Sequence, residues 1–209
     1  PEVRGVEVLG ERQILIEPVA GGLGRIGAVR PEVGPRDLVR EYAPSPRRQA
    51  RVSVENVLIV SGSQQGLDVV VRALIAPGDV VIVESPCYLG ALQVFRAAGA
   101  RLVGVPLDEE GMQVGVLERL LGRGQAKLIY TLPTFQNPTG SVLSLARRER
   151  LIELARRYQV PILEDDPYGD LRYEGADVPP LKALDSGGHV IYLSTFSKVL
   201  FPGLRLGYL

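Results

Sequence analysis

The chain has 209 residues, of which 45% are hydrophobic and 23% are charged, and its 24 basic side chains balance 24 acidic ones. This composition is typical of a folded globular protein and excludes binding to a polyanion driven by net charge. The single Cys87 excludes an internal disulfide, and with the single His189 it leaves no cysteine and histidine cluster for zinc. No run approaches the ~20 apolar residues of a membrane span, and the first residues lack the order of a secretory signal, so we expect a cytoplasmic protein.

Residues 1–54 predict an irregular N-terminal segment, because 13 of them are glycine or proline and only residues 13–16 have the pattern of a strand. Residues 22–27 spell the dinucleotide-binding pattern G-x-G-x-x-G. That pattern needs a strand before it and a helix after it, and Pro18 and Pro31 interrupt both. We therefore interpret it as a glycine-rich loop.

Residues 55–209 predict one α/β domain, because short β-branched runs alternate there with helical patterns. The runs are nearly all apolar, as in strands covered on both faces, and span residues 57–60, 80–83, 102–105, 127–131, 160–163 and 190–193. Two helical stripes lie between them, formed by Leu67, Val70, Val71 and Leu74 and by Leu151, Leu154, Ala155 and Tyr158. Turns are predicted at 76–79 and 108–111. Residues 206–209 begin a further strand and stop, so we expect a fragment of a longer protein.

The segment Ser61-Gly62-Ser63-Gln64-Gln65-Gly66 joins the first of these strands to a helix that starts near Gln64. Free backbone N–H groups and the positive end of the helix dipole suit a phosphate there, and a serine at the N-cap would add a hydroxyl. An ordinary capped helix is the alternative.

Two further strand ends carry polar residues. The stiff loop 133–140 presents Asn137 at the ligand-facing edge of an open α/β sheet, although an asparagine in a turn is the simpler reading. Glu164, Asp165 and Asp166 follow the next strand, and so many like charges favour a bound cation or protonated ring nitrogen. An all-oxygen magnesium site and a solvated run of charges are the alternatives.

The last strand end, residues 194–198, brings hydroxyls and Lys198 close to Arg205. Taken alone, Lys198 is an ordinary surface lysine. Together, however, a lysine, an acid and a phosphate-binding turn are the groups that pyridoxal phosphate requires.

These motifs resemble the fold type I aminotransferases that depend on pyridoxal phosphate, in the branch of the 2-aminoadipate and kynurenine aminotransferases and the related MocR-type regulators. The motifs are S-G-S-Q-Q, N-P-T-G, E-D-D-P-Y and T-F-S-K followed by P-G-L-R-L-G-Y, in the family order from about residue 56 to 209. The resemblance implies a mostly parallel, seven-stranded-type sheet with helices on both faces. It also implies that 55–209 is an incomplete large domain without the C-terminal small domain.

The resemblance further implies three catalytic residues. Lys198 is similar to the lysine that forms the internal aldimine, and Asp165 to the acid paired with the pyridine nitrogen. Tyr168 is similar to a donor to the ring hydroxyl oxygen.

More cofactor contacts follow from the same resemblance. Asn137 is similar to the second donor to the ring oxygen, and Tyr88 to the aromatic residue that stacks on the ring. The expected phosphate-binding residues are Ser63, Gln64 through its amide, Thr195, Ser197 and Arg205. No metal ligand is implied.

The implied activity is amino-group transfer between an amino acid and a 2-oxo acid, in a homodimer of the intact protein. Two alternatives stay open. One is the effector domain of a MocR-type regulator, which would contact nucleic acid only through a DNA-binding domain upstream of this segment. The other is a non-catalytic remnant.

Overall fold

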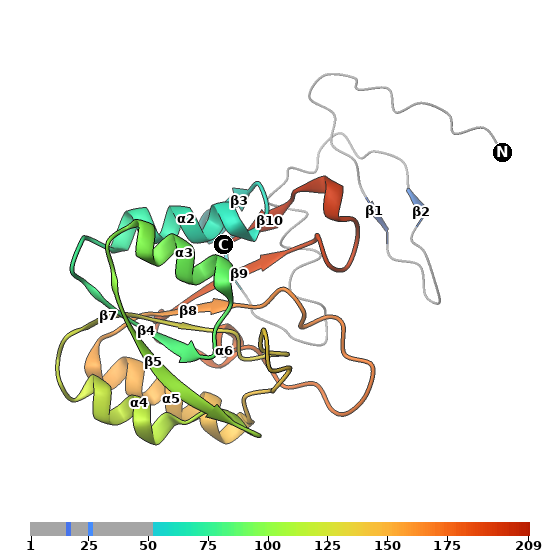
Figure 1. Cartoon of the computed structure of the whole chain (residues 1–209). Helices are drawn as coiled ribbons and strands as arrows, with labels where there is room; N and C mark the ends of the chain where they lie inside the picture. The colour runs from blue at the N-terminus through green and yellow to red at the C-terminus, as the bar shows by residue number, and fades with distance from the viewer. Residues whose placement is uncertain (1–15, 18–24, 27–51) are drawn as a thin grey trace.

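The computed structural model of the chain describes residues 16–17, 25–26 and 52–209 (Figure 1). One eight-stranded sheet organises the described residues. From edge to edge its strands are β3 (Ile59–Val60), β10 (Gly207–Tyr208), β9 (Val190–Thr195), β8 (Ile162–Asp165), β7 (Ala126–Thr131), β4 (Val80–Ser85), β5 (Arg101–Asp108) and β6 (Gly111–Met112). A separate antiparallel pair is formed by β1 (Ile16–Glu17) and β2 (Arg25–Ile26).

The five central strands run parallel, and only the edges of the sheet are antiparallel. β4 pairs with β5 and β7, β7 with β8, and β8 with β9, all in parallel register. β10 is antiparallel to both β9 and β3, and β6 folds back on β5. The predicted mostly parallel α/β sheet is confirmed. The strand number is eight rather than seven, because the sheet includes the two-residue β6, which begins at the last residue of the predicted turn at 108–111.

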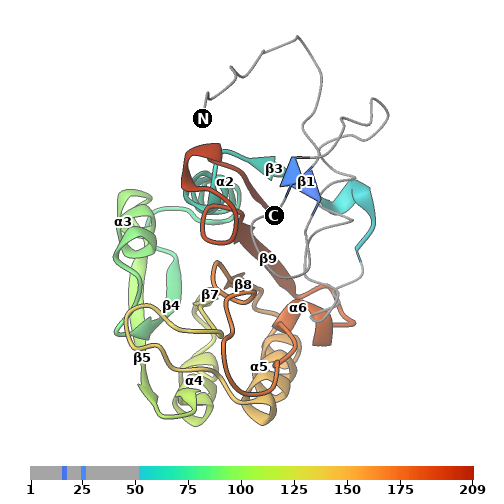
Figure 2. The ribbon, with the colours of Figure 1, turned by 90° about the vertical axis from the view of Figure 1, so that its right-hand side faces the viewer.

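Helices cover both faces of the sheet, as predicted (Figures 1 and 2). α2 (Ser63–Leu74) and α3 (Leu89–Ala97) lie on one face, and α4 (Val114–Leu121), α5 (Leu145–Tyr158) and α6 (Leu181–Leu184) lie on the other. Two short 3-10 turns, η1 (Val54–Asn56) and η2 (Pro202–Leu204), complete the described elements. Each face therefore has its own apolar core.

Successive side chains of β4 point to opposite faces of the sheet, so this strand contributes to both apolar cores. Val81 and Val83 pack against α2 and α3, whereas Ile82 packs against α4 and α5. The predicted helical stripes are confirmed: Leu67, Val70 and Val71 are buried in α2, and Leu74 packs beside them. The second stripe packs α5 in the same way, with Leu151, Leu154 and Ala155 buried and Tyr158 partly so.

One strand boundary was predicted wrongly in a way that matters for the site. The sequence predicted a strand at 160–163, but β8 runs from Ile162 to Asp165, and Glu164 and Asp165 are buried within it. Hydropathy places carboxylates outside a strand, whereas tertiary contacts bury these two. The first predicted strand, 57–60, is also shorter than expected, since only Ile59 and Val60 form β3.

Most predictions on the N-terminal segment lie outside the described residues. Ile16, the last residue of the strand predicted at 13–16, is in β1, and Arg25 and Ile26 of the glycine-rich pattern form β2. The rest of 1–51 is not described. Within the part of the chain that the structure describes, no helix has both the length and the apolarity to cross a membrane.

Close backbone contact joins β10 to the start of α2. A Cβ atom on Gly207 would lie 2.8 Å from both the carbonyl carbon of Gly62 and the amide nitrogen of Ser63, and 2.9 Å from the Ser194 oxygen. These are backbone atoms that cannot rotate away. Gly207 therefore allows the antiparallel strand to lie against the N-terminus of α2.

We predict that Gly207→Ala lowers the free energy of unfolding by about 1–3 kcal/mol, because overpacking against backbone forces the strand and the helix apart. Denaturant unfolding measures the change. Gly115→Ala is the matched control, since Gly115 lies in α4 with open space where its Cβ would stand. The control should be neutral or slightly stabilising. Equal effects of the two substitutions would contradict this account of Gly207.

Candidate active site

The candidate site lies at the edge of the sheet where the parallel strands end. The strands β4, β7, β8 and β9 finish at Ser85, Thr131, Asp165 and Thr195, so the loops that follow them emerge on one side. In open α/β sheets, ligands bind outside these carboxyl ends. All the residues singled out from the sequence lie on these loops, at the strand ends, or at the start of α2.

The start of α2 has the geometry of an anion site. Its N-cap is Gly62, at φ 75° and ψ 162°, with no side-chain capping bond, so the predicted serine N-cap is wrong and Ser63 is the first helical residue. A Cβ on Gly62 would meet the Arg205 guanidinium at 2.8 Å. Arg205 therefore lies against the helix end, where the first N–H groups have no intrahelical acceptor.

The segment after β9 lies beside the same helix end. The Thr195 hydroxyl is 2.9 Å from the Leu206 oxygen and 3.0 Å from the Ser197 hydroxyl, and it accepts a 3.2 Å hydrogen bond from the Ser197 N–H. Gly207 pairs with Thr195 and contacts Ser63. Four of the five predicted phosphate-binding residues thus come together. The fifth, Gln64, follows Ser63 and is exposed.

Asp165 is the most unusual polar residue of the site. It is 3% exposed, and its Oδ2 accepts a 2.7 Å hydrogen bond from the Tyr130 hydroxyl. Its Oδ1 is buried and has no hydrogen-bond partner among the described residues. Burial raises the pKa of Asp165 to about 7; the Tyr130 hydrogen bond opposes the shift and the Asp166 charge adds to it. An unpaired buried carboxylate oxygen is costly, so it favours a donor from a ligand.

Lys198 and two tyrosines belong to the same neighbourhood. The Lys198 Nζ lies 5.9 Å from the centre of the Tyr168 ring. Burial raises the pKa of Tyr88, and the charges of Asp165 and Tyr168 add to this shift. The Tyr88 hydroxyl also donates a long 3.4 Å hydrogen bond to Gln64 Oε1. The half-buried Asn137 lies in the loop after β7, at this edge of the sheet.

The three consecutive carboxylates are not a solvated run of charges, which corrects one alternative drawn from the sequence. All three are buried, and each has a different partner. Glu164 accepts from the backbone N–H groups of Leu181 and Lys182 at the start of α6. Asp165 faces Tyr130, and Asp166 accepts from the Tyr192 hydroxyl at 3.0 Å. This divergence does not support the magnesium alternative, and no metal-binding cluster of His, Cys, Asp or Glu occurs within the described residues.

Sequence reasoning missed four buried polar residues that support the site: Tyr130, Glu84, Gln136 and Arg148. Arg148 donates to the carbonyls of Leu143, Pro133 and Pro179 and so fixes both ends of the loop that carries Asn137. Tyr130 and Glu84 are polar residues in otherwise apolar strands, and this break in the pattern could have marked them in the sequence. Nothing local in the sequence marks Arg148.

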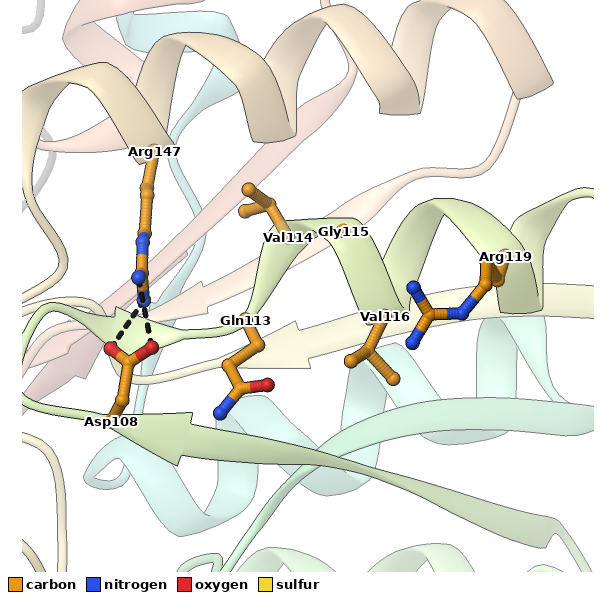
Figure 3. Close-up of a pocket in the computed structure, with 7 residues that line it drawn as sticks. All are labelled: Asp108, Gln113, Val114, Gly115, Val116, Arg119 and Arg147. Carbon is orange, nitrogen blue, oxygen red and sulfur yellow. Dashed lines mark hydrogen bonds and ion pairs between the residues drawn. The ribbon is translucent and has the colours of Figure 1, made fainter.

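A hollow elsewhere on the surface contains none of the predicted site residues (Figure 3). It is lined by Asp108, Gln113, Arg119, Arg147 and the first turn of α4. Arg147 already pairs with Asp108 at 2.6 Å and with Glu110 at 3.3 Å. These two carboxylates therefore balance the charge of Arg147 in the hollow.

Comparison with known proteins identifies the family. Residues 36–209 match aminotransferase class I and II, and the chain belongs to that family. It is 43% identical over its whole length to aromatic-amino-acid aminotransferase 1 of Thermococcus litoralis, of which it covers 51%. It is 39% identical, again over its whole length, to the uncharacterized HTH-type transcriptional regulator YisV of Bacillus subtilis, of which it covers 43%.

A solved structure agrees with this assignment. The α-aminoadipate aminotransferase LysN of Thermus thermophilus, complexed with N-(5'-phosphopyridoxyl)-L-leucine, superimposes with a TM-score of 0.75 at 39% identity over 83% of this chain and 43% of that one. The family expected from the motifs is therefore confirmed, and with it the kind of cofactor that the family uses. The chain spans about half the length of the curated relatives it matches.

We predict that Tyr130→Phe raises the pKa of Asp165 further, because the substitution removes the donor that offsets burial. Carboxyl titration by NMR of the cofactor-free chain measures the shift from the wild-type value of about 7. Tyr158→Phe, on the opposite face of the sheet, is the matched control and should leave the titration unchanged. An unchanged Asp165 titration in Tyr130→Phe would show that this hydrogen bond does not stabilise the carboxylate.

Proposed function

We propose that this chain is the cofactor-binding part of an aminotransferase that uses pyridoxal phosphate to move an amino group between an amino acid and a 2-oxo acid. The carrying observation is the unpaired Oδ1 of Asp165, buried at a strand end near Tyr88 and Tyr168. A protonated pyridine nitrogen would satisfy this oxygen and neutralise its charge. The anion site at the start of α2, with Arg205 against it, fits the phosphate of the same molecule.

The assignment of residues to the cofactor follows this fit. Asp165 would hold the ring nitrogen, and Tyr88 would stack on the ring. Asn137 and Tyr168 would donate to the ring oxygen. Ser63, the Gln64 amide, Thr195, Ser197 and Arg205 would bind the phosphate, with the guanidinium giving charge-assisted hydrogen bonds. Lys198, beside Tyr168, is the amine that would condense with the aldehyde.

The proposal also assigns roles in turnover to the protein residues. When bound, pyridoxal phosphate supplies a ring that accepts electrons from the Cα–H bond of an amino acid. Asp165, as a carboxylate, would hold a proton on the ring nitrogen. The Lys198 amine would be the general base that takes the proton from the substrate Cα and the general acid that returns it.

A homodimer in the intact protein is part of this proposal. Leu200, Phe201 and Leu204 are 48%, 62% and 45% exposed on the segment between Lys198 and Arg205. Apolar side chains so close to the site support burial by a second copy. A cytoplasmic location remains a prediction from the sequence.

A regulator is the second candidate function. It is favoured by the 39% identity to an HTH-type transcriptional regulator across the whole chain. The two candidates share the cofactor site and differ in what accompanies it: a winged helix-turn-helix segment encoded upstream would decide for the regulator. A non-catalytic remnant would be indicated by a folded chain that takes up no cofactor.

We predict that pyridoxal phosphate added to the wild-type chain gives the absorbance band of lysine-bound cofactor, and that Lys198→Ala abolishes it, because no other amine lies beside Tyr168 among the described residues. Borohydride reduction followed by peptide mass analysis should place the adduct on Lys198. Lys127→Ala, at an exposed position of β7, is the matched control and should keep the band. A band in both lysine variants, or no band in wild type, would refute the assignment.

A further inference from the structure

The loop that carries Asn137 and the segment that carries Tyr88 are joined by two buried side chains, Glu84 and Gln136. Glu84 ends the apolar part of β4 and is 3% exposed, and Gln136 precedes Asn137 and is 2% exposed. The proposed function gives neither residue a role. These two buried polar side chains contact each other although they lie 52 residues apart in the sequence. Their burial therefore calls for an explanation.

Glu84 accepts hydrogen bonds at both of its carboxylate oxygens. Its Oε1 accepts from the Thr131 hydroxyl and from the Leu132 N–H at 3.2 Å. Its Oε2 accepts from Gln136 Nε2 at 3.0 Å. Burial raises the pKa of Glu84 to about 7, and the hydrogen bonds from Thr131, Gln136 and the Leu132 N–H oppose that shift because they favour the ionised carboxylate.

The Gln136 amide is oriented by this carboxylate. Its Nε2 donates to Glu84 Oε2 and, at 2.9 Å, to the Pro86 carbonyl. Its Oε1 accepts from the backbone N–H and the hydroxyl of Thr139, at 2.9 and 2.8 Å. A flipped amide would place its NH₂ against the Thr139 N–H and its oxygen against two acceptors. Only one orientation satisfies all four contacts.

The main chain of Gln136 adds to the same arrangement. Its N–H donates to the Ser141 carbonyl at 2.9 Å, and its carbonyl accepts from the Gly140 N–H at 2.6 Å. Gln136 thus closes the loop 136–141 on itself, while its side chain ties that loop to β4 and to Pro86. Asn137 is the next residue of this loop, and Tyr88 lies two residues after Pro86.

We propose that Glu84 and Gln136 form a positioning pair, the Glu84–Gln136 clamp, that sets Asn137 and Tyr88 at the cofactor together. The proposal rests on the proposed function for what these two side chains contact. The clamp itself rests on the hydrogen bonds alone. A carboxylate is required at position 84, because an amide there would direct its NH₂ at the NH₂ of Gln136.

The first test needs no cofactor. In Glu84→Gln the Thr139 N–H should lose its fixed acceptor, and its hydrogen exchange, measured by NMR on the cofactor-free chain, should be at least about tenfold faster. Glu164→Gln is the matched control, because Glu164 is an equally buried carboxylate whose two acceptors serve α6. Exchange at Thr139 should not change in the control. Unchanged exchange in Glu84→Gln would overturn the clamp.

The second test reads the cofactor. By donating a hydrogen bond, the Asn137 amide would stabilise negative charge on the ring oxygen. Without this donor, the ring oxygen would hold the proton of the Lys198 nitrogen more strongly, and that proton would be lost only at higher pH. The pH midpoint of the absorbance change of lysine-bound pyridoxal phosphate should therefore rise by about half a unit or more in Glu84→Gln. If hydrogen exchange at Thr139 is faster but the pH midpoint does not change, Glu84 and Gln136 stabilise the loop without positioning Asn137. That result would overturn the positioning role.

Adding Gln136→Glu to Glu84→Gln should restore both readouts in part, because the amide at position 84 can then donate to a carboxylate at position 136. The Pro86 contact would remain lost. Failure of the double variant to recover either readout would contradict the proposed pairing. A wild-type chain that takes up no pyridoxal phosphate would refute the proposed function, and the exchange measurement would still decide whether the clamp exists.

Discussion

A carboxylate buried at the end of β8 with one oxygen unpaired is the constraint on which the candidate site depends. Taking Asp165 out of water costs free energy, and the 2.7 Å bond from Tyr130 satisfies only one of its oxygens. If the residue at this position served only to stabilise the fold, an apolar side chain would cost less free energy to bury. The remaining oxygen has no donor among the described residues, and in the proposed function a protonated ring nitrogen would supply both the hydrogen bond and the opposite charge.

The sheet brings the other groups to this carboxylate. Because four parallel strands end at one edge, Glu84, Thr131, Asp165 and Thr195 all lie at or next to the carboxyl ends of neighbouring strands. The antiparallel return of β10 brings Arg205 back against the N-terminus of α2, and Gly207 permits the close approach. Arg148 and the Glu84–Gln136 pair then hold the loop between β7 and α5 by its backbone. Rigid support of this kind preorganises a binding site.

Much of the fold was predictable from the sequence, because apolar runs and helical stripes are local patterns. The end of β8 was not, because hydropathy treats Glu164 and Asp165 as exposed, while the helix start at α6 and the Tyr130 hydroxyl make their burial possible. The same limit hid Glu84, Gln136 and Arg148, whose partners lie far away in the chain. The candidate residues were found through motifs at strand ends, and their individual roles remain predictions.

The central claim is that Asp165 binds the ring nitrogen of pyridoxal phosphate. NMR of the chain reconstituted with cofactor labelled with ¹⁵N in the ring tests this contact directly. We expect the shift of a protonated pyridine in the wild-type chain, maintained to a pH at which free cofactor has lost that proton, and the shift of an unprotonated ring in Asp165→Asn. The same ring-nitrogen shift in both proteins would contradict the account.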